Sequence, residues 1–204
     1  MTQEKPQLRP IAEGDHSLLG EIITEGFADD PVNLWAFRGT GAMLPIYTEM
    51  ARDLYVPKGF GDCSLDGQAC SLWLAPGANV SFGVRASLVI GHALVRHAGV
   101  TGIRNALAVN NAMGKKHPKE PHYYLFAIAA RPQAQGRGLG GALMRNALER
   151  IDAEGMPAYL ENSKERNISF YRHFGFEVME QIQAHKNAPP LWAMWREPRT
   201  PGGV

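Results

Sequence analysis

The sequence lacks the features that mark membrane, secreted and nucleic-acid-binding proteins. No apolar run approaches the roughly 18 residues that a membrane-spanning helix needs, so we expect no membrane partner. The first residues, MTQEKPQLRP, contain no apolar signal region, which favours a cytoplasmic protein. Charge of one sign is not in excess, because 21 Lys and Arg stand against 20 Asp and Glu. The net charge of +1 gives no electrostatic reason to expect nucleic acid as a partner.

Cysteine is also scarce, and its two positions favour neither a metal site nor a disulfide. Neither Cys63 nor Cys70 has metal-ligand spacing with a histidine, and we expect no metal. Asp66 and Gly67 stand between two apolar runs, which predicts a two-residue hairpin turn with Cys63 opposite Cys70. This is the wider, hydrogen-bonded kind of pair, and opposition alone does not meet the geometry of a bridge. Together with the expected compartment, this favours free thiols.

Strand-like and helix-like segments follow one another along the chain and indicate a single domain over residues 1–204. The hydrophobic content of 45% suits one globular core. We expect a helix through EGDHSLLGEIITEGFADDP that Pro31 ends, a helix beginning near Pro45, and a helical insert at about 79–118 made of two helices. A short helix in KERNISFYRHFG and an amphipathic helix after GLGG are also expected. The expected strands are QLRPI, 60–65, 68–75, HYYLFAIAA, PAYLEN, FEVMEQIQA and PLWAMWRE.

Four glycines between an apolar strand and an amphipathic helix predict a phosphate-binding loop. They are Gly136, Gly138, Gly140 and Gly141, within RPQAQGRGLGG. Glycine lets backbone N–H groups converge on one point and lets a phosphate approach without a Cβ clash. The helix beginning near Gly138 adds the partial positive charge of its N-terminus, and Arg137 supplies a side-chain donor.

Two kinds of phosphate loop fit these letters. Gly136-x-Gly138-x-x-Gly141 matches the dinucleotide fingerprint of an oxidoreductase, and Glu161 stands where a ribose-binding acid would follow. However, RPQAQ separates the strand from the glycines, and the chain after Glu161 is too short to complete a doubly wound sheet. A dinucleotide-binding oxidoreductase is therefore a remote alternative.

Three stretches resemble the GCN5-related N-acetyltransferases (GNAT). They are ARPQAQGRGLGGALM, in which Gln135-x-x-Gly138-x-Gly140 matches that family's pyrophosphate loop, then AYLENSKERNISFYRHFGFE, and the closing PLWAMWREP. The segments GFADDPVNLWAF and LWLAPG are similar to the subgroup that includes puromycin N-acetyltransferase. The resemblance implies an α/β (α+β) GNAT fold, in which a mixed, strongly twisted central sheet is flanked by helices and its two middle strands splay apart.

The resemblance also implies an acetyl-CoA-dependent N-acyltransferase that needs no metal. Such an enzyme, as a monomer or homodimer, moves an acetyl group to a primary amine, here of a small molecule, by direct attack in a ternary complex. A resistance role, as in the puromycin enzyme, would rest on analogy alone. The alternative is a catalytically inactive GNAT-fold protein that binds acyl-CoA or regulates; the intact glycine loop and Tyr171 argue against it.

The coenzyme contacts that the resemblance implies lie on a strand, a loop and a short helix. The strand HYYLFAIAA should part from its neighbour after Tyr124–Ile128, which frees backbone groups near Ile128–Ala130 for the amides of the pantetheine arm. A backbone N–H there can polarise the thioester carbonyl. Asn167 caps or lines the short helix, with Ser163 or Lys164 as alternatives. The full set is Ile128, Ala129, Ala130, Gln135, Gly136, Arg137, Gly138, Leu139, Gly140, Gly141 and Asn167.

Acetyl transfer needs a neutral amine, a stabilised oxyanion and a protonated leaving thiolate. The resemblance places Tyr171 at the coenzyme sulfur as the leaving-group acid; the alternative is a core tyrosine beside Phe170 and Phe174. Glu161 ends the strand PAYLEN beside the splay and is the expected base, directly or through a water. An exposed carboxylate at a strand end is the alternative for Glu161.

The acceptor pocket is expected on the first helices and the insert. Asp29 and Asp30 could attract a cationic amine, although DDP is equally typical of a solvated helix stop. His117 and His122 flank a loop and are expected to be structural, but His122 opens the central strand near the acceptor side. The expected acceptor contacts are Phe27, Asp30, Trp35 and Trp73.

Overall fold

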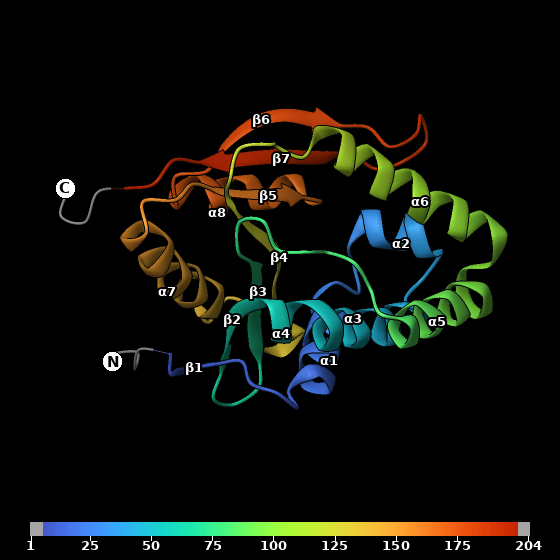
Figure 1. The fold of residues 1–204 in the computed structure, drawn as a ribbon, viewed down its shortest axis with the longest axis horizontal. Coiled ribbons are helices and arrows are strands. Elements are labelled where there is room, and N and C mark those ends of the chain that lie inside the picture. Colours follow the sequence, from blue (N-terminus) through green and yellow to red (C-terminus); the bar gives the residue numbers. More distant parts are fainter. Residues whose placement is uncertain (1–5, 200–204) are drawn as a thin grey trace.

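The computed structural model describes residues 6–199, and its seven strands form one sheet in the order β1-β2-β3-β4-β5-β7-β6 (Figure 1). Only β4 and β5 run parallel; every other neighbouring pair is antiparallel. This mixed sheet confirms the expected fold class and rules out the doubly wound sheet of the dinucleotide alternative. The strands are β1 Leu8–Pro10, β2 Gly59–Ser64, β3 Ala69–Leu74, β4 Tyr123–Ala130, β5 Ala158–Asn162, β6 Glu177–Ile182 and β7 Leu191–Arg196.

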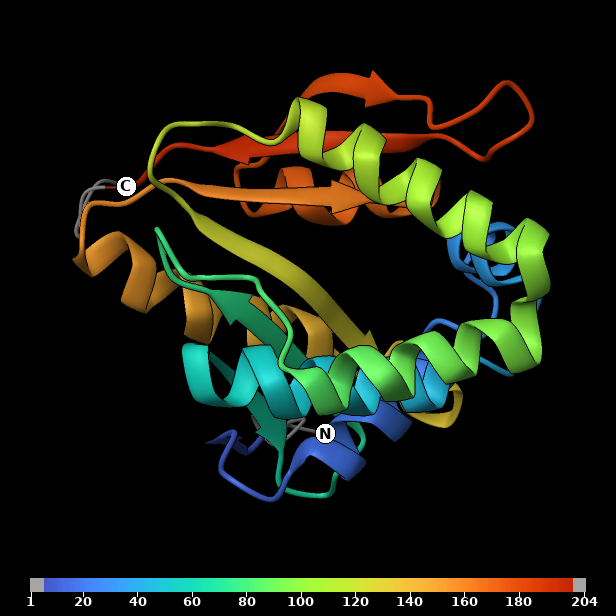
Figure 2. The ribbon, with the colours of Figure 1, turned by 45° about the vertical axis from the view of Figure 1, so that its right-hand side comes forward.

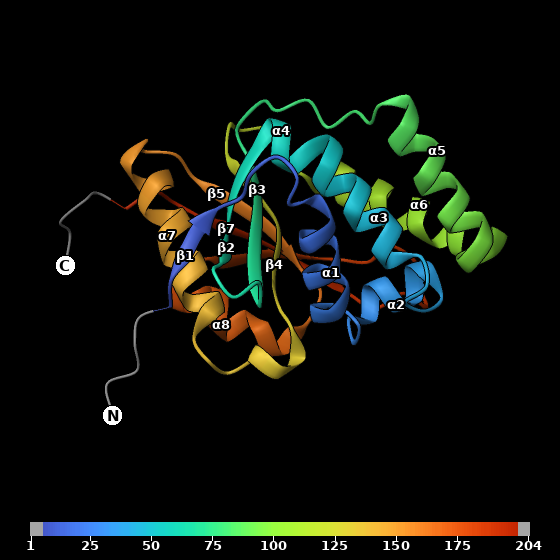
Figure 3. The same ribbon diagram turned by 90° about the horizontal axis from the view of Figure 1, so that it is seen from below.

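Helices cover both faces of the sheet. Helices α7 and α8 lie on one face, and α1, α2, α3, α5 and α6 lie on the other, as the view from below shows (Figure 3). Two helices fill most of the stretch predicted as a helical insert. Among residues 6–199, no helix is both long enough and apolar enough to cross a membrane. The helices are α1 His16–Gly26, α2 Pro31–Phe37, α3 Met43–Met50, α4 Val56–Lys58, α5 Val84–Ala93, α6 Gly99–Lys116, α7 Leu139–Ala153 and α8 Ile168–His173.

The expected end of the first helix is wrong, because Pro31 begins a helix instead of ending one. Helix α1 ends at Gly26, and Pro31 is the first residue of α2. A proline at this position loses only an N–H group that has no acceptor within the helix. The Asp30 carboxylate accepts a hydrogen bond from Asn33 N at 2.9 Å and so caps α2.

The hairpin of β2 and β3 has the predicted register, with Cys63 opposite Cys70. Both cysteines are buried and free. Burial raises the pKa of each thiol, so neither is a ready nucleophile at neutral pH.

Apolar side chains form a layer on each face of the sheet. On one face, α1 and α3 pack on β2, β3 and β4 through residues that include Leu19, Ile23 and Met43. On the other face, α7 is amphipathic as expected, and the residues of its apolar side are buried, among them Leu139, Leu143, Ala147 and Ile151. These two layers hold β4 between them.

The parallel ladder between β4 and β5 is short. It joins Tyr123 to Ala158 and ends with Leu125 opposite Leu160. Beyond that pair β4 continues along β3 to Ala130, while β5 turns away, so the two strands diverge (Figure 2). The splay predicted from the sequence is therefore present, but it begins after Leu125 and leaves a longer stretch of β4 unpaired on this edge.

Candidate active site

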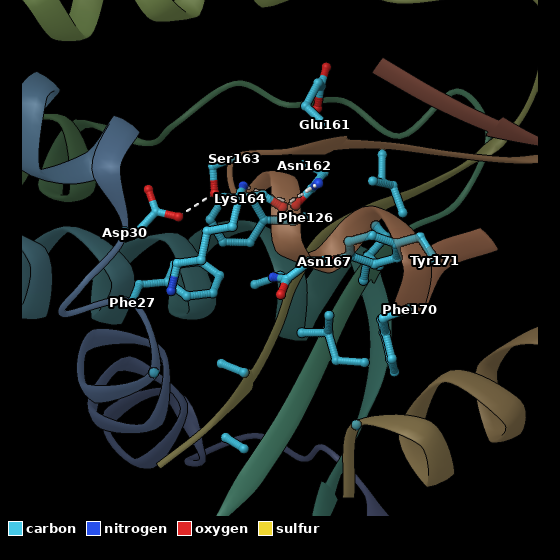
Figure 4. A pocket seen from close by; sticks show the side chains of 18 of the residues that line it. Phe27, Asp30, Phe126, Glu161, Asn162, Ser163, Lys164, Asn167, Phe170 and Tyr171 are labelled. Atoms are coloured by element: carbon cyan, nitrogen blue, oxygen red, sulfur yellow. Dashed lines mark hydrogen bonds between the residues drawn. The ribbon is translucent and has the colours of Figure 1, made fainter. Parts of the chain in front are cut away.

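A cavity of about 700 Å³ lies where β4 and β5 separate. The glycine loop and the start of α7 line one part of it, the end of α1 and helix α6 another, and β4, β5 and α8 the rest (Figure 4). Fourteen of the seventeen residues predicted for the site line this cavity: Phe27, Asp30, Ile128, Ala129, Ala130, Gln135, Gly136, Gly138, Leu139, Gly140, Gly141, Glu161, Asn167 and Tyr171. Arg137, Trp35 and Trp73 are outside the lining.

The glycine loop has the backbone geometry that its sequence predicts. Gly136 and Gly138 each have φ of 77°, in the left-handed region where an L side chain is strained. Gly138 is the N-cap of α7, so the first N–H groups of this 15-residue helix stand at the cavity without acceptors inside the helix. Helix termini of this kind bind anions, which makes the loop a site for a phosphate group.

Arg137 belongs to the glycine loop but is not among the residues that line the cavity. Its guanidinium is 3.8 Å from the Asp66 carboxylate, and more than half of its side chain is exposed. A phosphate at the loop would therefore meet backbone N–H groups first.

Tyr171 lines the cavity from α8 and is buried. Burial, and then the negative charge of Asp30, raise the pKa of its phenol well above the ordinary value. The hydroxyl is therefore protonated at neutral pH and can donate a proton or a hydrogen bond. The ring of Phe170 packs edge-on against the Tyr171 ring, with 5.2 Å between the ring centroids. The ring of Tyr171 is therefore part of the core, as the alternative expected, and its residue also lines the cavity.

Asn167 lines the cavity, but it does not cap α8 as one version of the prediction required. It occupies the N-cap position without a side-chain hydrogen bond to the helix. The two alternatives for its role are engaged elsewhere, because Ser163 donates to the Asp30 carboxylate and Lys164 pairs with Asp29. Of the three candidates, Asn167 is the one that lines the cavity without an ion pair or hydrogen bond to Asp29 or Asp30.

The expectation that DDP is a solvated helix stop is wrong for Asp30, which is buried, whereas the Asp29 side chain is 58% exposed although it forms ion pairs. Asp30 is only 2% exposed and binds Asn33 N and the Ser163 hydroxyl. Asp29 pairs with Lys164 and with Arg166, whose Nη2 lies 2.6 Å from Asp29 Oδ2. The segment ties the end of α1 to the turn that follows β5, and only Asp30 lines the cavity.

The two tryptophans predicted as acceptor contacts do not reach the cavity. Trp73 is fully buried in the core beneath α7, stacked on Phe60 at 6.0 Å, because β3 is an inner strand with both faces covered. Trp35 lies on α2, where its ring stacks on His185 at 6.2 Å. Both expectations are corrected: aromatic character alone did not reveal which face each residue occupies.

Glu161 is a buried carboxylate at the end of β5. Its side chain is 2% exposed, and neither carboxylate oxygen has a hydrogen-bond partner among residues 6–199. Burial, and then the charge of Glu161, raise the pKa of the phenols of Tyr124 and Tyr159. The alternative of an exposed carboxylate at a strand end is therefore wrong, while the role of Glu161 as base stays a prediction; Glu161 is one of the residues that line the cavity.

Several lining residues were not predicted from the sequence. They share an apolar or aromatic character and surround the part of the cavity near Asp30 and Glu161; among them are Tyr47, Val109, Met113, Tyr124 and Phe126. The alternation of YYLF could have placed Tyr124 and Phe126 on one face of β4. Nothing in the local sequence brings α6 to the same cavity, because that contact depends on how the chain returns to the sheet.

A family model described as the acetyltransferase (GNAT) family matches residues 52–176. The chain belongs to the GNAT family. The match includes the glycine loop, both splayed strands and Tyr171, so the region that matches the family model contributes most of the cavity described above. The matching region does not distinguish the puromycin subgroup, and that finer likeness stays a prediction.

GNAT proteins similar to this chain include both a curated relative and solved structures. An uncharacterised N-acetyltransferase of Schizosaccharomyces pombe is 25% identical over 206 residues, covering 91% of this chain and 81% of that protein. A structure described as histone acetyltransferase HPA2 and related acetyltransferase, from Corynebacterium glutamicum, has a TM-score of 0.71 at 25% identity and covers 97% of this chain and 99% of that one. PaiA N-acetyltransferase of Thermoplasma acidophilum, solved with coenzyme A, has a TM-score of 0.54 at 10% identity, covers 95% of this chain and 99% of that one, and shares the fold.

Proposed function

We propose that this GNAT-family protein transfers the acetyl group of acetyl-CoA to a primary amine of a small molecule, by direct attack in a ternary complex. The observation that carries the proposal is the continuity of one cavity. It joins the glycine loop, the separated strands, the protonated phenol of Tyr171 and the buried carboxylate of Glu161. A site for the coenzyme phosphates and a site for proton transfer would thus be parts of a single cavity.

The coenzyme would occupy the side of the cavity formed by β4 and the loop. Backbone N–H groups from Gly136 to Gly141 would hold the pyrophosphate, as at other helix N-termini. The pantetheine amides would pair with the edge of β4 that β5 leaves free, near Ile128–Ala130, as an added strand does. Asn167 offers an amide to the same arm. A backbone N–H of β4 would stabilise the oxyanion that forms at the thioester carbonyl.

The reaction needs two proton transfers at the acetyl group. Glu161, directly or through a water, would accept a proton from the acceptor ammonium, which leaves a neutral amine able to attack. The tetrahedral intermediate would then expel the coenzyme thiolate, which Tyr171 would protonate. In Figure 4, Glu161 lies apart from Tyr171, so the two groups can serve different partners in the same complex.

The acceptor would lie near Phe27, Asp30 and Tyr47, on the side to which α6 contributes Val109 and Met113. Helix α6 thereby supports the assignment of 79–118 as an insert on the acceptor side of a single domain. Apolar and aromatic walls around a buried carboxylate suit a small amine with an apolar body. Because the whole cavity is about 700 Å³ and the coenzyme arm takes part of it, the space favours a small molecule over a folded protein surface.

Thermal unfolding with and without coenzyme tests the first half of the proposal. Acetyl-CoA should raise the melting temperature by mass action, and NADH at the same concentration should leave it unchanged. Equal stabilisation by NADH would contradict the proposal. The alternative of an inactive GNAT-fold protein predicts the same stabilisation by acetyl-CoA, but no acetylated amine; an assay of acetyl transfer separates the two.

A further inference from the structure

Glu161 is the inner end of a row of side chains that reaches the protein surface. Its Oε1 lies 3.6 Å from Nδ1 of His117, the residue after the last turn of α6. The Nε2 of His117 lies 3.1 Å from the Nε2 of His122, which precedes β4. The side chain of His117 is 38% exposed, whereas Glu161 and His122 are buried. Among residues 6–199, His117 is the only basic side chain within ion-pair distance of Glu161.

The hydrogen bonds of His122 determine which nitrogen of His117 carries a proton. Nδ1 of His122 lies 2.6 Å from the carbonyl oxygen of Glu120, which can only accept, so this nitrogen donates. Burial, and then the proximity of His117, lower the pKa of His122, so its other nitrogen is an acceptor at neutral pH. The bond between the two rings therefore requires a proton on Nε2 of His117. In neutral His117 the unprotonated Nδ1 then faces Glu161.

The stoichiometry of acetyl transfer leaves one proton to be removed from the cavity. Two protons leave the nitrogen of an ammonium acceptor as the amide forms; one ends on the sulfur of the coenzyme, and the other must reach bulk water. Glu161 is buried, so it cannot return this proton to water directly. Nδ1 of His117 is 3.6 Å from Oε1 of Glu161, a few tenths of an ångström longer than a hydrogen bond. The His117 ring is also partly exposed to water.

We propose that His117 takes the acceptor's proton from Glu161 and returns it to solvent, and that His122 holds the His117 ring in the orientation that allows this transfer. The inference rests on the proposed function, in which Glu161 is the base. The proton passes from the amine nitrogen to a carboxylate oxygen, then to Nδ1 of His117; the imidazolium releases one proton to water and becomes neutral again. His117 and His122 are positioning residues, because both act through Glu161.

The other titratable groups around Glu161 do not offer a competing route. Three phenols face it, from Tyr55, Tyr124 and Tyr159, and burial followed by the charge of Glu161 raises the pKa of each, so they stay neutral. On β6, Glu180 is paired with Lys116 at 2.6 Å. Glu120 contributes its backbone carbonyl to His122. His117 is thus the group in this cluster that can become cationic and also reach water.

Kinetics of two variants test the proposal with an acceptor taken from a panel of 2-phenylethylamine, tyramine, putrescine and spermidine. With the panel amine that the wild type acetylates fastest, His117→Ala should lower kcat by about 10²-fold near pH 7, the low end for a proton-transfer role, and leave KM for acetyl-CoA unchanged. Added imidazole should restore part of the rate. The loss should shrink toward about pH 10, where an alkylamine loses its own proton in water. The control is His92→Ala, an exposed histidine of α5, which should match the wild type.

A measurement that needs no acceptor keeps the inference distinct from the proposed function. In ¹⁵N-labelled protein, the ring nitrogen signals should show His122 protonated on Nδ1, and Glu161→Gln should shift the ring signals of His117 but not those of His92. These spectra test the contact between Glu161 and His117 even if the His117→Ala variant does not fold. The proposal is overturned if the ring signals of His117 do not shift in Glu161→Gln, or if kcat of His117→Ala equals that of the wild type. If no panel amine is acetylated while the ring signals respond as expected, the proposed function fails and the histidine–carboxylate coupling stands.

Discussion

Leu125 and Leu160 are the last paired residues of the ladder between β4 and β5, and both line the cavity that opens where the strands separate. The pairing of these two residues therefore decides how much of the β4 edge is free for the coenzyme. Both side chains are buried, and both belong to the core layer under α7 and α8. The same apolar packing that closes the sheet thus sets the position where the thioester would lie.

Gly138→Asp should abolish stabilisation by acetyl-CoA. The change places a side chain at a left-handed position and a negative charge where the pyrophosphate would bind. Gly77→Asp is a matched control, because Gly77 has φ of 74°, equally open surroundings and a loop position outside the cavity. Thermal unfolding with acetyl-CoA measures both variants. A normal shift in Gly138→Asp, or an equal loss in Gly77→Asp, would show that the loop does not hold the phosphates.

Tyr171→Phe should lower turnover by roughly 10²–10⁴-fold, the scale of a positioned proton donor. Affinity for acetyl-CoA should change little, because the lost hydroxyl acts chiefly in the transition state. The control is Tyr123→Phe, which also removes a phenol hydroxyl, here one that donates to the Glu154 carboxylate at 2.7 Å and lies outside the cavity. Steady-state kinetics with the acceptor amine as substrate measure kcat for both variants. Near-normal turnover with an unchanged pH profile would make Tyr171 a core residue, and Glu161→Gln should then show the larger loss.

Arg196→Met should destabilise the protein by about 3–5 kcal/mol, as expected when one partner of a buried ion pair is removed. Arg196 is 3% exposed, binds both oxygens of Asp152 at 2.6 and 2.7 Å, and donates to the carbonyl of Phe174. Denaturant unfolding at pH 7 gives the difference. The more exposed pair of Arg9 and Asp15 is the comparison, and Arg9→Met should cost about 1 kcal/mol or less. Equal losses in the two variants would contradict this account.

The same ion pair predicts a loss of stability in acid. Burial alone would raise the pKa of Asp152, but its hydrogen bonds with Arg196 hold it below the ordinary value. Because the pKa of Asp152 is lower in the folded state, the ion pair adds its full share to the free energy of unfolding above the unfolded-state pKa of about 3.9. This share decreases as the pH falls through the folded-state pKa. The difference between the wild type and Arg196→Met should therefore narrow below about pH 4. A difference that is constant down to pH 2 would be inconsistent with an ionised Asp152 in the fold.

Cys63 and Cys70 should resist alkylation in the native protein and both react after unfolding without reductant. Both thiols are buried, and burial raises the pKa of each, so little thiolate is exposed. Mass spectrometry after iodoacetamide treatment should find no adduct in the native protein and two in the denatured one. Recovery of a peptide bridged between residues 63 and 70 from fresh material would contradict the expectation of free thiols.

Features decided by neighbouring residues could be predicted from the sequence. The two-residue turn predicted at Asp66 and Gly67 is replaced by a loop from Leu65 to Gln68, in which Gly67 N donates to the carbonyl of Ser64. Because this longer loop is centred on the same two residues, Cys63 still lies opposite Cys70, as predicted. The glycine loop and the helix after it were equally local. The splay was implied by the resemblance to GNAT proteins, and its starting point at Leu125 was not, because a ladder ends where packing on both faces stops supporting it.

Features decided by long-range packing could not be predicted. Trp73 was expected in the acceptor pocket, but the burial of both faces of β3 places it in the core. Pro31 fits a helix end and a helix beginning equally well until the carboxylate of Asp30 is seen to cap the next helix. The approach of His117 to Glu161 joins the end of α6 to the end of β5, and no spacing within the sequence signals a contact of that kind.

The most direct test of the central claim is the release of free thiol from acetyl-CoA in the presence of the amine panel, with the products identified by mass spectrometry. The account predicts thiol release that depends on the amine, with one acetylated amine formed for each thiol, and a rate that falls in both Tyr171→Phe and Glu161→Gln. Stabilisation by acetyl-CoA without any amine-dependent thiol release would contradict it, and would make this GNAT-family protein a binder of acyl-CoA instead of an acetyltransferase.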